Sequence, residues 1–185
     1  MAKTVKKVDE EKFVETAQEE VTQTEYKPLN LEEQITVKSI AGWTTGFSRL
    51  LSIGDVTIPP RGVVRLSRGE VITQVQSGNK LFGGYGENPG DHATLIIEDD
   101  LTLRELGMEN AKVFSDKVVK DIFAITGYEA FLSALKEKIQ TRAEKYSAMV
   151  SIIKLGLNDY SKIRAFEEHT GYKMEKVKGD ELRTR

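Results

Sequence analysis

The residues of this chain that could do chemistry are few and widely spaced. Asp91 and His92 are adjacent, and Glu98 follows six residues later, a set that could serve a hydrolase or a transferase. His169 is the only other histidine, and neither histidine has a partner at the His-x-x-x-His spacing of metal sites. A structural role for His92, with a possible Asp91–His92 hydrogen bond, is therefore the favoured prediction. The chain has no cysteine, which excludes thiolate catalysis, disulfides and sulfur-ligated metals.

Two further motifs have the composition of ligand sites. The acids at 98–100 could hold a hard cation, but a calcium loop spreads its ligands over about a dozen residues, with a turn-forming glycine among them. Placed before Leu101, these acids instead favour a helix N-terminus. Gly83-Gly-Tyr-Gly86 has the composition of a phosphate-binding loop, but no Gly-Lys-Ser/Thr follows it, and a strand is expected next. We therefore expect no cofactor, no metal and no enzymatic activity.

The same glycine-rich stretch is predicted to form a long hairpin loop between strands at 70–77 and 92–98. Lys80, Phe82 and Tyr85 would then lie near the tip of this loop. Because loops often carry function and aromatic side chains often anchor protein interfaces, we predict that these three residues bind a partner.

Residues 35–98 have the pattern of β structure. Ile35–Ile40 alternates apolar and polar residues with a period of two. Further strands are predicted at 55–58, 62–66, 70–76 and 92–98, with Trp43 and Phe47 in the core. Short strands spaced by about ten residues predict a small antiparallel β-barrel or sandwich. Three arginines in this region would form a solvated strand face or meet acids on a partner: Arg61, Arg65 and Arg68.

After Leu101 the apolar period becomes helical. A single turn should stop at Gly107, and Ser115 should cap a helix over 116–124. A capping box at 126–129 should open the longest helix, to about residue 155, and Asn158 should cap the last helix, which Gly171 would end. Strands followed by helices predict a segregated α+β fold, with an arm at 1–34, a β module at 35–100, a helical part at 101–174 and a charged tail at 175–185.

The N-terminal arm differs in composition from the rest of the chain. Residues 1–34 carry five lysines and nine acidic residues, a net charge of 5 − 9 = −4. Such a segment buries too little apolar surface to offset its ordering entropy, so we expect a flexible arm. Phe13, Ala17 and Val21 share one stripe at helical spacing, which is too narrow to support an isolated helix. The arm is therefore either a solvated tail or a segment that orders on a neighbour through Phe13 and Val21.

Overall charge and hydropathy limit the partners. A net charge of −2 argues against direct nucleic-acid binding, which needs a clustered basic surface. No stretch approaches the roughly 20 apolar residues of a membrane span, and the first residues lack the apolar core of a secretory signal. These patterns predict a protein made in the cytoplasm that binds no membrane.

One longer stretch, Leu81-Phe-Gly-Gly-Tyr-Gly-Glu-Asn-Pro-Gly-Asp-His-Ala-Thr-Leu-Ile-Ile-Glu-Asp99, resembles head-associated structural proteins of tailed bacteriophages. The segments 143–145, 159–163 and 168–171 fit the same resemblance, which covers about residues 35–172. It implies a non-enzymatic virion protein, made in the host cytoplasm, that acts as a decoration or minor capsid component. Its partners would be the major capsid protein or other virion subunits, bound in many copies or as a homo-oligomer, with the arm ordering on a neighbouring subunit.

Three alternatives stay open on the sequence alone. A neck or tail component would share the same sequence features. A ligand- or glycan-binding β-barrel could use Trp43, Phe82 and Tyr85 as stacking surfaces. A hydrolase or transferase built around Asp91, His92 and Glu98 is the least favoured.

Overall fold

The first strand organises the sheet of this protein. The structure is a computed structural model that describes residues 29–174. Strand β1 (Gln34–Ser39) lies at the centre of a three-stranded antiparallel sheet, between β4 (Val63–Ser67) and β5 (Leu95–Ile97). In its register, Thr36 lies opposite Arg65 and Lys38 opposite Ile96. The predicted alternation in β1 is confirmed, because Ile35 and Val37 are buried while Lys38 is exposed.

A second, smaller sheet pairs β2 (Thr45–Ser48) with β3 (Asp55–Ile58). Seven helices accompany these strands in the described part of the chain, so the predicted α+β class is confirmed. The five strands form two separate antiparallel sheets and no closed barrel within residues 29–174. The predicted barrel or sandwich is therefore not confirmed.

The prediction of a strand at 70–77 is wrong, because α1 (Arg68–Gln76) occupies these residues. The Oγ atom of Ser67 caps this helix by accepting a hydrogen bond from the backbone N–H of Glu70. Asn79 then caps the short helix α2 (Lys80–Gly83). The glycine-rich stretch thus begins with a helix that packs on the sheet, and it is not the connection of a β-hairpin.

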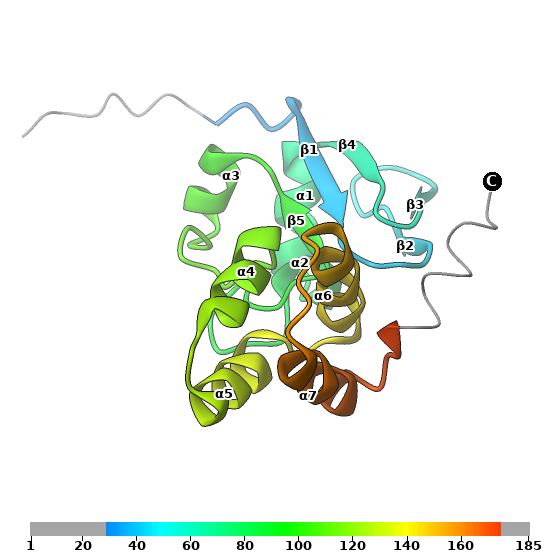
Figure 1. The fold of residues 1–185 in the computed structure, drawn as a ribbon. Coiled ribbons are helices and arrows are strands. Elements are labelled where there is room, and N and C mark those ends of the chain that lie inside the picture. The colour runs from blue at the N-terminus through cyan, green and yellow to red at the C-terminus, as the bar shows by residue number, and fades with distance from the viewer. Residues whose placement is uncertain (1–28, 175–185) are drawn as a thin grey trace, which may run out of the picture.

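The remaining helices follow in one run after β5 (Figure 1): α3 (Asp100–Glu105), α4 (Asp116–Ala124), α5 (Tyr128–Lys138), α6 (Arg142–Lys154) and α7 (Tyr160–Thr170). The helix N-terminus expected at the acids 98–100 is confirmed, with Asp99 as the cap of α3, and so is the cap of α4 by Ser115. Gly107 and Gly171 follow the ends of α3 and α7 with positive φ. Asp159 rather than Asn158 caps α7.

The single long helix predicted over 128–155 is wrong. The chain breaks at Ile139, which is fully buried and whose carbonyl oxygen lies 2.8 Å from His169 Nε2. The capping box lies at Thr141 and Glu144 and opens α6, whereas α5 starts at Gly127 without a side-chain cap. The helices therefore fold back on one another around a core that includes Phe131 and Phe166.

One glycine allows the segment after α2 to approach its neighbour closely. Gly84 has φ 73° and ψ −166°, a conformation that is essentially restricted to glycine, and a Cβ atom there would overlap the carbonyl oxygen of Asp91. Gly78 also has a positive φ, but a Cβ atom there would meet nothing within 4 Å. A comparison of substitutions at the two positions therefore separates the cost of backbone strain from the cost of steric overlap.

We predict that Gly84→Ala destabilises the fold far more than Gly78→Ala. The left-handed conformation at residue 78 should cost about 1 kcal/mol, whereas strain and overlap at residue 84 should together cost about 3 kcal/mol or more. Urea unfolding followed by circular dichroism measures both losses. Equal losses would contradict the close approach of Gly84 to Asp91.

Candidate functional site

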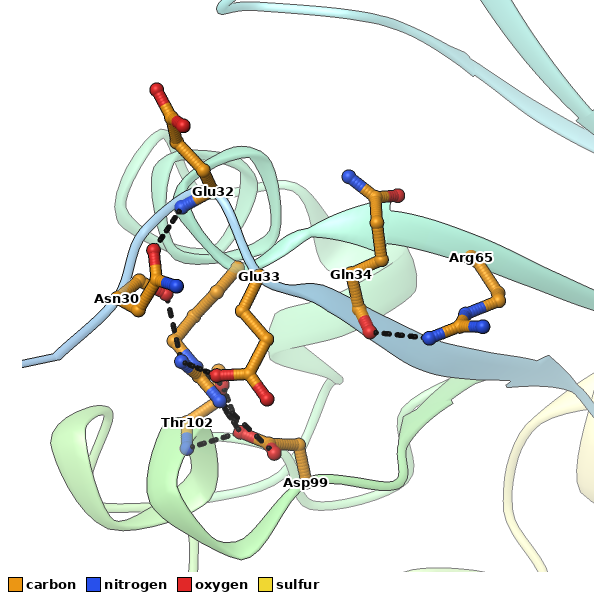
Figure 2. Close-up of polar contacts among 8 residues, drawn as sticks. Asn30, Glu32, Glu33, Gln34, Arg65, Asp99 and Thr102 are labelled. Carbon is orange, nitrogen blue, oxygen red and sulfur yellow. Dashed lines mark hydrogen bonds and ion pairs between the residues drawn. The ribbon is translucent and has the colours of Figure 1, made fainter.

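A buried arginine fixes the start of the folded chain. Arg68, the first residue of α1, is 1% exposed, and its guanidinium group binds Asn30, Glu33, Asp99 and Thr102, which are labelled in Figure 2. Nη1 donates to the Asn30 carbonyl oxygen and to Glu33 Oε2, each at 2.7 Å. The other side of the group contacts the Asp99 carboxylate at 3.2–3.3 Å and Thr102 Oγ1 at 3.1 Å. One side chain therefore joins residues 30–33, α1 and α3.

Backbone hydrogen bonds hold the same segment against α1. The N–H of Arg68 donates to the Glu33 carbonyl oxygen and the N–H of Gly69 to that of Leu31, both at 2.8 Å. Residues 30–33, which the composition assigns to the arm, are thus attached to the folded part. The acids that Arg68 meets belong to its own chain and not to a partner, so the expected exposed position of this arginine is wrong.

A buried carboxylate fixes a neighbouring loop. Glu70 is 1% exposed and accepts hydrogen bonds from the backbone N–H groups of Leu50 and Leu51 at 2.8 and 2.9 Å. Gln74 Nε2 donates to the same carboxylate and to the carbonyl oxygen of Ser48. Burial opposes ionisation of Glu70, but the hydrogen bonds from Gln74, Leu50 and Leu51 outweigh it and hold its pKa below the ordinary value. The connection between β2 and β3 is therefore anchored to α1.

The segments that Arg68 and Glu70 hold in place carry large apolar side chains that are exposed to solvent. We call these residues the apolar patch: Leu31, Leu50, Leu51 and Ile53. These residues are 54%, 50%, 60% and 104% exposed. Two of them, Leu31 and Leu51, line a groove of about 500 Å³ together with Ile72 of α1. Leu31 and Leu51 thus share one groove, and exposed apolar surface of this kind marks interaction sites on soluble domains. The patch is the strongest candidate for a functional surface.

A glycine brings the two parts of the apolar patch together. A Cβ atom on Gly69 would lie 3.2 Å from Leu51 Cδ1 and 3.3 Å from the Leu31 carbonyl oxygen. Because Gly69 has no side chain, residues 30–33 at the end of the arm (the arm root) can approach the β2–β3 loop over the start of α1.

The predicted partner-binding residues lie in different environments. Tyr85 is 62% exposed and Lys80 is exposed, so both remain available to a partner. The expected position of Phe82 at a loop tip is wrong, because Phe82 is fully buried and packs edge-to-face on Phe47 with ring centroids 5.2 Å apart. Phe13 and Val21 lie outside the described residues.

Asp91, His92 and Glu98 do not form a catalytic set in the structure. His92 Nδ1 lies 2.7 Å from Glu144 Oε1, with both side chains buried, so the expected Asp91–His92 hydrogen bond is wrong. Asp91 instead accepts from the backbone N–H of Lys112 at 2.6 Å and from Asn88, while Glu98 is exposed.

The role of Glu144 was missed by sequence reasoning. Its Oε2 atom accepts hydrogen bonds from the backbone N–H groups of Gln140 and Thr141, while Oε1 meets His92. The pattern Thr141-x-x-Glu144 was the available signal for a capping box. This pair ties the segment before β5 to the start of α6.

The stacking surface proposed for a glycan is not assembled either. Trp43 packs against Tyr146 with centroids 6.4 Å apart, and the Arg142 guanidinium lies 4.5 Å from the Trp43 ring centroid. Phe82 belongs to the core beneath the sheet, whereas Trp43 packs on the helical core. These aromatic groups therefore do not share one surface.

Within residues 29–174, no group of three or more histidine, aspartate or glutamate side chains is placed to hold a metal ion. The helices of this same range are all too short or too polar to cross a membrane. No protein-family model matches the chain, and neither a curated protein nor a solved structure matches it.

We predict that Arg68→Ala lowers the free energy of unfolding by about 3 kcal/mol, because it leaves the Asp99 and Glu33 carboxylates without their shared cation. Arg65→Ala is the matched control, since Arg65 is exposed and donates only to the Gln34 carbonyl oxygen. Its loss should stay within about 0.5 kcal/mol. Chemical denaturation measures both variants, and similar losses would contradict the role of Arg68.

We also predict that acid weakens the anchor at Glu70. Because its pKa is lower in the folded state, its contribution is complete above the unfolded value, 4.5, and is lost as pH falls toward the folded value. Glu70→Gln should therefore cost about 2 kcal/mol at neutral pH, and this difference from the unsubstituted protein should shrink below pH 4.5. Urea unfolding at a series of pH values tests this, and a pH-independent difference would refute it.

Proposed function

We propose that the protein is a non-enzymatic structural component of a tailed-bacteriophage head, a decoration or minor capsid protein that binds major capsid or other virion subunits in many copies. The observation that carries a partner-binding role is the apolar patch, held in place by Arg68 and Glu70. The virion assignment is supported by the resemblance of residues 81–99 to such proteins.

The size of the apolar patch suits a contact that is repeated many times. Most of its side chains are already partly covered, so docking gains a fraction of the roughly 1.5–3 kcal/mol of a fully buried leucine or isoleucine. Much of this gain is offset by the entropy of association. A single patch therefore gives weak binding, and firm attachment needs a second contact on the same neighbour.

The N-terminal arm can supply that second contact. Leu31 belongs to the apolar patch, and Arg68 holds Asn30 beside it, so the arm leaves the folded part next to the docking surface. A tethered second contact acts at an effective concentration of about millimolar for short linkers. The arm and the patch can thus engage one neighbouring subunit together.

We predict that the double variant Leu51→Asp/Ile53→Asp loses co-sedimentation with purified phage heads while its free energy of unfolding changes by less than about 0.5 kcal/mol. The reason is that both side chains are exposed, so the charges cost little in the free protein but are desolvated in an interface. The measurement compares the pelleted fraction of each variant across a range of head concentrations.

Leu101→Asp is the matched control, because Leu101 is also about half exposed, at 51%, but lies on α3. A chain lacking residues 1–28 keeps Asn30 and Glu33 and reports the contribution of the arm. Unimpaired pelleting of the double variant would refute the docking role of the patch. Binding to isolated necks or tails but not to heads would move the protein to that part of the virion.

A further inference from the structure

A second surface lies at the other end of β1. It is a cleft of about 630 Å³ between the end of β1, the start of α4 and the end of α6, and we call it the basic cleft. Its charged lining consists of four cations and two acids: Lys38, Arg61, Lys117, Lys154, Glu98 and Asp116. The net charge of 4 − 2 = +2 contrasts with −2 for the whole chain.

Most of this positive charge is not neutralised within the folded part. Asp116 is already bound by Lys154 Nζ at 2.7 Å and by the Ser151 hydroxyl. These hydrogen bonds hold the pKa of Asp116 low although burial opposes this, and the nearby charges of Lys154 and Arg61 add to the effect. Lys38, Arg61 and Lys117 are exposed, and none forms an ion pair with another described residue.

The backbone of Arg61 adds an independent observation. Its φ is +52°, and within residues 29–174 His92 is the only other non-glycine residue with positive φ. The His92 side chain is used in the buried pair with Glu144, whereas Arg61 lines the basic cleft. Left-handed backbone costs a non-glycine residue about 1–2 kcal/mol, and such strain is characteristic of functional positions.

We propose that the basic cleft binds the acidic segment 9–25 of the N-terminal arm of the same molecule. This segment contains seven acidic residues and one lysine, a net charge of −6. It is the most acidic stretch of the chain outside the described residues, and its sign is opposite to that of the cleft.

The length of the chain permits this contact. From Asn30 to Lys38 the chain covers at most about 26 Å, and the stretch from residue 20 to residue 30 can span about 33 Å when extended. The tether supplies the segment at about millimolar effective concentration, which a second copy in micromolar solution cannot match. The arm of the same molecule is therefore favoured over that of another copy.

A nucleic acid is a poorer occupant than the arm. Glu98 and Asp116 line the cleft and would face the continuous negative charge of a phosphate backbone. A peptide that intersperses carboxylates with neutral residues can place its acids on the cations and its neutral positions near these two carboxylates.

Zero-length carbodiimide cross-linking of the full-length chain tests the proposal, because it joins a carboxylate and an amine only when they touch. Mass spectrometry should find the acids of segment 9–25 linked to Lys38 and Lys117 at several times the yield of links to Lys80 and Lys136. These two controls are exposed lysines on α2 and α5 without an ion pair to a described residue. Raising the salt to 1 M should suppress the specific links, since the screening length falls to about 3 Å.

Arg61→Gly removes one positive charge from the cleft without destabilising the fold, because glycine adopts the same backbone conformation without strain. The variant should keep the thermal midpoint of the unsubstituted protein while the yield at Lys38 and Lys117 falls about two- to fourfold, as expected for one exposed charge. Adding Lys154→Gln should lower the yield further.

Equal yields at cleft and control lysines, or yields unchanged by Arg61→Gly, would overturn the proposal. Mixing ¹⁴N- and ¹⁵N-labelled protein identifies the origin of the links, and links mainly between different copies would overturn the assignment to the same molecule. Co-sedimentation of the Leu51→Asp/Ile53→Asp variant does not report on the cleft, so failure here and failure of the proposed function are distinguishable.

Discussion

The fold of this protein depends on the buried guanidinium group of Arg68. It satisfies the carbonyl oxygen of Asn30, pairs with Glu33 and Asp99, and contacts Thr102, so that three segments distant in sequence share one cation. A buried charge costs several kcal/mol unless it is fully paired, and here each nitrogen of the guanidinium group has an acceptor. The position of the arm root is therefore a consequence of satisfying this charge, and the apolar patch follows from that position.

The other buried charges act in the same way. Glu70 holds the β2–β3 loop through two backbone N–H groups, and Glu144 joins the start of α6 to His92. Each charge links an irregular segment to a helix, at places where no sheet ladder could satisfy the backbone. The residues that look most capable of chemistry are thus engaged in fixing loops. Among the described residues, two surfaces are available to a partner. One consists of exposed apolar side chains at one end of β1, and the other of cations without an ion pair at its other end.

Local pattern was enough to predict elements whose ends are set by neighbouring residues. The alternation in β1 and the caps at Ser115 and Gly171 needed only short-range information. The prediction for residues 70–77 was wrong because Val71, Thr73 and Val75 alternate with other residues as in a strand. The helix that forms there is stabilised by hydrogen bonds between Glu70 and residues about 20 positions away, which local pattern does not contain. The break at Ile139 carries neither glycine nor proline. The partners of Arg68 lie 31–38 residues away in sequence, so no spacing could predict the site.

The two surfaces place opposite demands on the arm. The arm leaves beside the apolar patch, yet the charge that best complements its acidic segment lies at the far end of β1. When the arm is bound in the cleft of its own molecule, the apolar patch stays exposed. A partner with only apolar surface can then bind the patch but not the arm. A partner that also offers a stronger basic surface can draw the arm from the cleft and gain both contacts. Because the two contacts are tethered, their contributions reinforce one another, and discrimination between partners then rests on charge.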